Sequence, residues 1–149
     1  MARYSIDGQD TNTAATTILG VDAGATAHRI KVYDLVCGSD ATPADNAAEY
    51  VLQRYTVDGT STAVTPLALD PADAAALAEA GEAHSVEPTY TANAIALQWA
   101  QNQRATFRWV AAPGGEIIVP ATADSGVGVQ VITVSGSAVN TNVMIHFEE

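Results

Sequence analysis

The stretch RATFRWVAAPGGEIIVP, from Arg104 to Pro120, carries the clearest structural pattern in the sequence. From Phe107 to Ala111, apolar and other residues alternate with the period of a strand that has one buried face. Residues 113–115 are Pro-Gly-Gly, which ends a strand because proline has no N–H and glycine permits positive φ. Residues 116–119, Glu-Ile-Ile-Val, then return to a strand-like sequence. The stretch therefore predicts a β-hairpin.

Segments of strand length occur along the rest of the chain and are separated by turn residues. They are residues 16–21, 27–37, 49–57, 63–69, 94–100, 128–135 and 142–148. The inward residues are expected to include Ile95 and Trp99, while the second half of 27–37 is apolar on both faces. The pattern predicts an all-β fold, an antiparallel β-sandwich or jelly-roll-like domain of about eight strands, because parallel topologies require crossover helices.

One short helix is predicted at residues 71–80. Asp70 is a capping residue, Pro71 suits the first helical position, and Gly81 is typical of a helix end. The sequence Thr-Pro-Ala-Asp at 42–45 predicts a single further helical turn. Residues 72–90 then form a long excursion between strands, and such excursions are often functional. We expect partner contacts there.

The length of 149 residues indicates one domain. Residues 1–15 lack apolar periodicity and are expected to form an N-terminal arm, a second place for partner contacts, ahead of a single β-sandwich domain at 16–149. Asp7, Asp10 and Asn12 do not match the spacing of an EF-hand calcium loop.

The chain is strongly acidic, with 6 basic and 17 acidic residues and a formal net charge of −11. Nucleic acid is therefore not an expected partner, since phosphate binding depends on lysine and arginine. The first 20 residues show no basic segment followed by an apolar one, and no apolar stretch approaches about 18 residues. We expect a chain that is neither secreted by a signal peptide nor inserted in a membrane.

No catalytic, cofactor-binding or metal-binding residue is predicted. The single cysteine, Cys37, lies in an apolar run and is expected to be a buried, inert thiol. The sequence contains no Gly-x-Ser-x-Gly, GxGxxG, GxxxxGK[ST] or HExxH motif. We interpret Gly126-Val127-Gly128 as a turn or bulge and Glu148-Glu149 as a solvated acidic end. A hydrolase that uses His84 or His146 is the enzymatic alternative. The third histidine, His28, is expected at the start of a strand.

The positions of three aromatic residues allow two interpretations. Trp99, Phe107 and Trp109 lie on the apolar faces of their strands, so we expect core positions. Exposed aromatic residues would instead indicate a sugar-binding surface. Arg104 and Arg108 are expected to pair with carboxylates in so acidic a chain.

Several segments together resemble small virion proteins from the structural gene clusters of tailed bacteriophages. They are residues 102–116 (NQRATFRWVAAPGGE), 119–122 (VPAT), 145–149 (IHFEE), 84–89 (HSVEPT) and 4–8 (YSIDG). The likeness covers most of the chain but includes no catalytic signature and no motif tied to particular contacts.

The resemblance implies a capsid decoration, or cement, protein. Such proteins are β-rich, often trimeric, and hold the outside of the head where capsomers meet. The implied partners are further copies of the chain, as a homotrimer, and the major capsid protein. The implied location is the capsid exterior after synthesis in the bacterial cytoplasm. The alternative is a carbohydrate-binding head appendage that aids host adhesion.

Overall fold

The computed structural model describes residues 1–26 and 28–149, which contain strands and no helix. Twelve strands form two six-stranded sheets, and every strand pairing is antiparallel. The predicted all-β, antiparallel class is confirmed, but the expected number of about eight strands is too low, since residues 3–11 and 79–86 also form strands. In the same residues, no helix has the length and hydropathy needed to cross a membrane.

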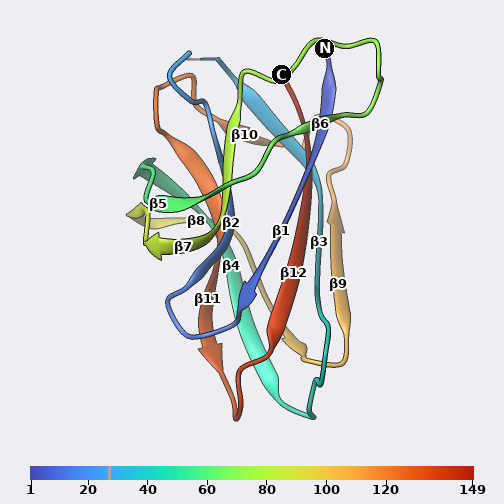
Figure 1. Cartoon of the computed structure of the whole chain (residues 1–149), viewed down its shortest axis with the longest axis vertical. Coiled ribbons are helices and arrows are strands. Elements are labelled where there is room, and N and C mark those ends of the chain that lie inside the picture. Colours follow the sequence, from blue (N-terminus) through green and yellow to red (C-terminus); the bar gives the residue numbers. More distant parts are fainter. Residues whose placement is uncertain (27) are drawn as a thin grey trace.

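The two sheets face each other (Figure 1). Sheet A contains β1 (Arg3–Thr11), β3 (Ile30–Ser39), β6 (Leu67–Ala68), β9 (Thr106–Val110), β10 (Ile117–Val119) and β12 (Asn140–Glu148). Sheet B contains β2 (Thr17–Asp22), β4 (Ala47–Val57), β5 (Thr60–Ala63), β7 (Glu79–Val86), β8 (Thr89–Asn102) and β11 (Gly126–Val134). The order in sheet A is β10-β3-β12-β1-β6, with β9 also on β3, and the order in sheet B is β5-β7-β2-β11-β4-β8.

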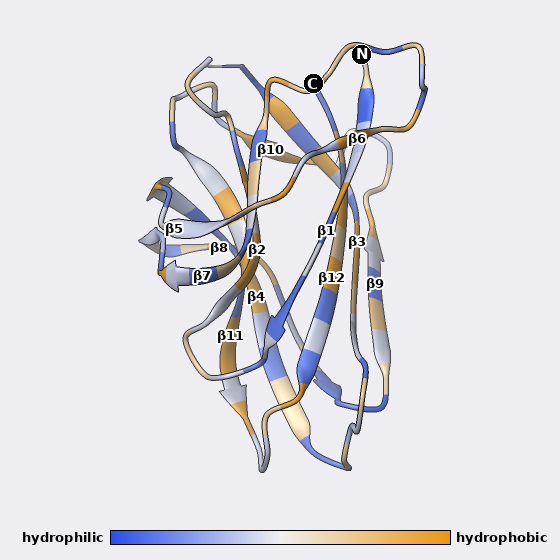
Figure 2. Ribbon diagram, viewed as in Figure 1, coloured by the Kyte–Doolittle hydropathy of each residue, from blue (hydrophilic) through white to orange (hydrophobic). Residues whose placement is uncertain are grey.

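Inward side chains from both sheets form one hydrophobic core. On β12, Val143, Ile145 and Phe147 are buried as their alternation predicts, and the strands in Figure 2 show the corresponding hydrophobic stretches. The ring of Phe147 stacks on Tyr4 of β1, with the centroids 5.4 Å apart. The alternation of apolar and polar residues along the strands therefore predicts which side chains of the two sheets pack against each other.

The predicted hairpin is wrong. β9 pairs with residues 34–38 of β3 and β10 pairs with residues 30–32, each in the antiparallel direction. Since both strands run the same way along β3, they cannot pair as a hairpin. The Pro-Gly-Gly segment interrupts one edge of the sheet without reversing the chain.

The predicted helix at 71–80 is also wrong: residues 71–78 are irregular and β7 starts at Glu79. Asp70 forms only an Asx turn, because its Oδ1 accepts the N–H of Ala72 at 2.9 Å. Beyond this turn, however, distant residues take the backbone groups that a helix would use. Tyr4 donates to the Ala74 carbonyl at 3.0 Å, and Glu149 accepts the N–H groups of residues 77 and 78 at 2.8 and 3.1 Å.

The helical turn expected at 42–45 is absent for the same reason. The N–H of Ala44 donates to the Gln103 side chain at 3.1 Å, and Arg104 donates to the Pro43 carbonyl at 3.4 Å. Gln103, at the corner where the chain passes from sheet B to sheet A, is itself buried. Local capping signals are weaker than such tertiary hydrogen bonds.

Residues 1–15 do not form a loose arm. Residues 3–11 are β1, which lies between β12 and β6 inside sheet A. The buried Asn12 fixes the end of this strand, because its side chain donates to Tyr50 at 3.0 Å and accepts the N–H of Val139 at 2.7 Å. The N-terminal stretch is therefore part of the sandwich.

A β-bulge explains the two apolar faces of residues 27–37. The expected start, Ala27, lies outside the described residues, and β3 begins at Ile30. His146 pairs with Asp34 and Phe147 pairs with Val32, so Tyr33 is an extra residue that reverses the alternation. The inward positions are thus 30 and 32 before the bulge and 35 and 37 after it.

Candidate functional sites

Three glycines leave room on the face of sheet B that points away from the core. Gly20 of β2 pairs with Gly128 of β11, and Gly126 lies two residues before Gly128 on the same strand. The residues that alternate with these glycines along the two strands point to the other face and belong to the core. A Cβ atom at Gly126 would lie 2.4 Å from the hydroxyl of Tyr55, and one at Gly128 would lie 2.5 Å from the hydroxyl of Tyr90. Glycine is required here because the two tyrosines lie directly on the backbone.

A second layer of side chains, mostly polar, covers this glycine surface. We call it the polar layer: Thr17, Asp22, Tyr55, His84, Glu87 and Tyr90. It draws on β2, β4, β7 and β8 and the connection between the last two. The rings of Tyr55 and Tyr90 meet edge to face with centroids 6.0 Å apart.

Asp22 is the buried carboxylate of the polar layer. Its Oδ1 accepts the N–H of Gly24 at 2.7 Å, and its Oδ2 accepts the hydroxyl of Tyr55 at 3.1 Å. Burial raises the pKa of Asp22 to about 6, and the nearby Asp58 and Glu79 act in the same direction, while the two hydrogen bonds oppose the rise. Burial also raises the pKa of Tyr55 well above its usual range.

Thr17 connects the other members of the layer. Its hydroxyl donates to Glu87 and accepts the hydroxyl of Tyr90 at 2.7 Å. A bulge at Ile18 of β2, opposite Val129 and Gln130 of the partner strand, places Thr17 on the outer face, on which Gly20 also lies. Without this change of register, strand alternation would point Thr17 toward the core.

The side chain of His84 is buried, and only one of its two ring nitrogens has a hydrogen-bond partner among the described residues. Its Nδ1 lies 3.2 Å from the Thr17 carbonyl, and because a carbonyl only accepts, Nδ1 carries the proton. Its Nε2 has no hydrogen-bond partner among residues 1–26 and 28–149. The nearest carboxylate oxygen is Oδ1 of Asp58, at 3.9 Å.

Next to the polar layer lies the acidic hollow, of about 270 Å³, between β2, β5 and β7. Three carboxylates line it, from Asp22, Asp58 and Glu79, together with the hydroxyl-bearing Thr60 and Ser61. In the described part of the chain, none of the three has a lysine or arginine within 4.0 Å. The hollow therefore holds negative charge without a cationic partner.

A different surface lies where the two termini meet. The segment between β6 and β7 arches over both termini (Figure 1). Four large apolar side chains are exposed there, and we call them the apolar end: Met1 (72%), Leu67 (68%), Leu69 (46%) and Leu77 (54%). Figure 2 shows hydrophobic stretches in this segment separated by hydrophilic ones.

Hydrogen bonds hold the apolar end together. Leu67 pairs with Ser5, and the N–H of Leu69 donates to the Arg3 carbonyl at 2.8 Å. Glu149 binds the N–H of Leu77 and also lies 2.7 Å from Nε2 of His28. A groove of about 340 Å³ opens beside these residues and has a mostly apolar lining that includes Tyr4, Ala74 and Ala75.

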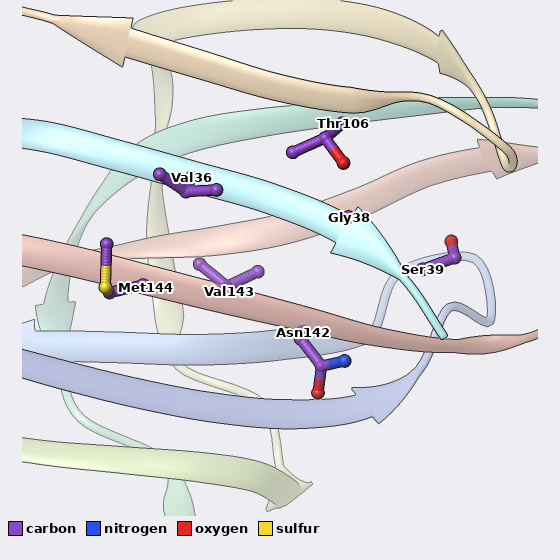
Figure 3. A pocket seen from close by; sticks show the side chains of 7 residues that line it. All are labelled: Val36, Gly38, Ser39, Thr106, Asn142, Val143 and Met144. Atoms are coloured by element: carbon purple, nitrogen blue, oxygen red, sulfur yellow. The ribbon is translucent and has the colours of Figure 1, made fainter. Parts of the chain in front are cut away.

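Figure 3 shows a third hollow, of about 250 Å³, on sheet A. Its side chains come from β3, β9 and β12 and include the methyl groups of Val36 and Thr106, the thioether of Met144 and the amide of Asn142. No titratable side chain lines it. This hollow could therefore fit a ligand by its shape, but its lining has no charged side chain to bind one.

The aromatic residues lie in and against the core. Tyr50, Trp99 and Phe107 form one stack across the two sheets, with neighbouring centroids 5.6 and 4.6 Å apart. Trp99 is 7% exposed, and Phe107 and Trp109 pack against the core. The core reading is confirmed, whereas Ile95, expected inside, is 46% exposed. The stacked rings give no support to an open sugar-binding surface.

Of the two arginines, one pairs as expected. Arg108 donates to both carboxylate oxygens of Asp34, at 3.1 and 2.7 Å, and lowers the pKa of that carboxyl, with His146 contributing 3.8 Å away. Arg104 instead donates to the Pro43 carbonyl. Burial raises the pKa of the Cys37 thiol to about 12, so the prediction of a buried thiol is confirmed.

Two other expectations need correction. Glu148 and Glu149 are not a solvated end: Glu148 lies 3.6 Å from Lys31, and Glu149 binds the backbone of residues 77 and 78. Gly126-Val127-Gly128 is neither a turn nor a bulge but the regular start of β11. His84 and His146 lie in different sheets, on β7 of sheet B and β12 of sheet A.

The polar layer and the acidic hollow were not found from the sequence. The only local indication was the pair of glycines at alternate positions, 126 and 128. Their role becomes clear only from the structure, in which Tyr55 and Tyr90 lie on them. Among the described residues, no three histidine, cysteine, aspartate or glutamate side chains are arranged to hold a metal ion. In comparisons with known proteins, no family model, no curated protein and no solved structure matches this chain significantly.

Proposed function

We propose that the chain is a non-enzymatic protein that decorates and stabilises the exterior of a tailed-bacteriophage capsid. The observation that carries the proposal is the apolar end, where four large apolar side chains are exposed on a strongly acidic chain. Large apolar side chains that are exposed together at one end of a protein commonly mark a site of protein contact. The apolar end is a suitable surface for docking on the major capsid protein.

The strand pairing supports the same proposal through the finer fold, which we infer to be a jelly roll. Strands from the first part of the chain pair in reverse order with strands from the second: β1 with β12, β2 with β11, β3 with β9 and β4 with β8. Four nested antiparallel pairs divided between two sheets are the arrangement of a jelly roll, a fold of viral capsid proteins and lectins. This support is fold-level analogy, since one fold serves many functions.

The charge balance supports a position outside the shell. A net charge of −11 disfavours contact with packaged DNA. A cement protein also needs a stiff scaffold whose modest contacts are repeated over the lattice. The continuous core between two sheets provides such a scaffold. We propose a homotrimer, with the apolar end and residues 72–90 in the contacts.

The test is binding to phage heads that lack this protein. The purified chain is expected to sediment as a trimer, to bind such heads and to raise the temperature at which they release DNA. Leu67→Glu and Leu77→Glu are expected to weaken binding at least about tenfold, because each places a charge in a desolvated contact. Ile95→Glu, on β8, is the control, since Ile95 is as exposed as Leu69 but lies in the other sheet.

Two results would contradict the proposal. The first is a strict monomer that does not bind heads. The second is binding that is equal for the wild type, Leu67→Glu and Leu77→Glu. An electron cryo-microscopy map of the intact particle would then show whether the chain lies on the exterior at all.

A further inference from the structure

The last strand of sheet B is unusual for a strand at the edge of a sheet. β8 has 14 residues, more than any other strand of the described chain, and it is paired on one side only, with β4. Most proteins protect an edge with a short strand, charged side chains or proline, because an edge exposes backbone N–H and C=O groups. From Thr89 to Asn102, β8 contains no aspartate, glutamate, lysine, arginine or proline. Neither its length nor its composition therefore protects this edge from another strand.

Only the second half of β8 has the regular geometry that another strand can join. Residues 97–102 pair one for one with residues 47–52 of β4, whereas extra residues interrupt the pairing between Tyr90 and Leu97. Such bulges bend a strand and end its regular pairing. We call residues 97–102 the open edge.

The hydrogen-bond pattern shows which backbone groups of the open edge point away from β4. At the end of the strand, the N–H of Gln103 donates to the Asn46 carbonyl at 2.8 Å. An antiparallel strand bonds to a given neighbour at every second residue, so the odd-numbered residues bond to β4 and Gln98, Ala100 and Asn102 point away. Among residues 1–26 and 28–149, the backbone groups of Gln98 and Ala100 have no other hydrogen-bond partner, and both residues are exposed. Another β-strand can bind such a row of donors and acceptors.

The strand that suits the open edge best is the open edge of a second copy. Two copies of a chain with a net charge of −11 repel each other over most of their surfaces, but the open edge carries no charge of its own. The neighbouring carboxylates of Glu49 and Asp45 already accept the side-chain amides of Gln98 and Asn102, each at 2.5 Å. A two-fold axis through Ala100 would place this small residue opposite itself and Gln98 opposite Asn102, so neutral side chains would meet throughout.

We propose that the open edge of β8 pairs in the antiparallel direction with the open edge of a second copy of this chain, so that sheet B continues from one copy into the other. A two-fold contact of this kind cannot close a trimer, so it joins chains that belong to different copies of the proposed trimer. It goes beyond the proposed capsid function and does not depend on it, because the apolar end lies elsewhere, around β6 of sheet A and the termini.

The first test is amide hydrogen exchange of the whole chain, measured by NMR at low and at high protein concentration. Exchange at Gln98 and Ala100 is expected to slow as the concentration rises, whereas Trp99, whose N–H bonds to β4, is protected at both concentrations. Ala63 of β5, at the opposite edge of the same sheet, is the internal control. Its N–H also points outward, because the next residue, Val64, donates to β7, and its exchange is expected to stay fast.

Two substitutions at Ala100 make the test specific. Ala100→Pro removes an outward N–H but no hydrogen bond to β4, and an edge strand tolerates proline on its solvent side. Ala100→Lys places two like charges opposite each other on the two-fold axis. Each is expected to weaken the association measured by sedimentation equilibrium at least about tenfold. Ala63→Pro and Ala63→Lys make the same changes at the opposite edge and are expected to associate like the wild type.

A cysteine tests the register. Residues directly opposite each other in a hydrogen-bonded antiparallel pair have Cα atoms about 5.5 Å apart, a distance that a disulfide can span. Oxidation by copper–phenanthroline and air is therefore expected to cross-link Ala100→Cys into a covalent dimer faster than Ala63→Cys. The native Cys37 is buried and does not compete.

The proposal is overturned if exchange at Gln98 and Ala100 does not depend on concentration, or if Ala100→Lys associates as tightly as the wild type. It is also overturned if Ala63→Lys weakens association as much as Ala100→Lys, or if Ala100→Cys cross-links no faster than Ala63→Cys. Head binding, which depends on the apolar end, is measured separately, so the failure of one proposal is distinguished from the failure of the other.

Discussion

Asp22 is the residue at which the environment changes the chemistry of a side chain most clearly. It is almost fully buried, and its pKa is raised to about 6 from 3.8, with burial as the largest cause. The folded chain therefore holds this proton more tightly than the unfolded chain. In such a case stability is lost as the pH rises from the unfolded pKa through the folded one. Perturbed carboxylates of this kind occur often at binding sites.

Asp22→Asn is expected to stabilise the protein at pH 7 relative to the wild type and to have little effect at pH 4. A shift of this size corresponds to at most about 3 kcal/mol, reduced by the partial exposure of the hollow to solvent. The asparagine can still accept from Gly24 and can donate to the Tyr55 hydroxyl.

Urea denaturation of both proteins at several pH values between 4 and 8 measures the difference. The result expected is a gap that opens between pH 4 and 6 and is constant above. A gap that is constant over the whole range, or that closes as the pH rises, would contradict the assignment of a raised pKa to Asp22.

At the scale of elements, the contacts between the sheets decide how the strands are used. The stack of Tyr50, Trp99 and Phe107 joins β4 and β8 of sheet B to β9 of sheet A. Stacked rings contribute through buried area and through their geometry. The chain passes between the sheets at residues 103–105, beside this stack, so the rings stabilise the crossing.

Trp99→Ala is expected to lower the free energy of unfolding by about 3–5 kcal/mol, because it leaves a cavity between Tyr50 and Phe107. Val110→Ala, at a position that is exposed on β9, is the control and should change it by no more than about 0.5 kcal/mol. Chemical denaturation followed by circular dichroism measures both. A loss for Trp99→Ala no larger than that for Val110→Ala would show that the stack carries no stability.

At the scale of the whole molecule, the nested pairing makes the fold depend on contacts between the ends of the chain. β12 lies between β1 and β3, so the last strand completes the middle of sheet A. Long-range pairings of this kind form slowly and cooperatively, because the chain loses entropy on closing the loop before the stabilising contacts form.

Deletion of residues 140–149 is therefore expected to abolish cooperative unfolding. β1 and β3 would lose their shared neighbour, and the core would lose Val143, Ile145 and Phe147. Deletion of Glu149 alone, which lies beyond β12, keeps the cooperative transition and serves as the control. Thermal melting by circular dichroism distinguishes the two. Sharp melting of the longer deletion would show that β12 is dispensable.

The sequence by itself determined the all-β class, most strand positions, the buried Cys37 and the core role of Trp99, because each follows from local alternation of apolar residues. It did not determine the fate of residues 71–80, where capping signals predict a helix but Tyr4 and Glu149 bind the backbone.

Only the tertiary structure decided that β9 and β10 share one edge of β3 and that tyrosines cover the glycines of β2 and β11. It also brought Asp22, Asp58 and Glu79 around one hollow. The physical reason is the same in each case: these arrangements depend on hydrogen bonds and burial between residues far apart in the chain, and a local pattern contains no information about such partners.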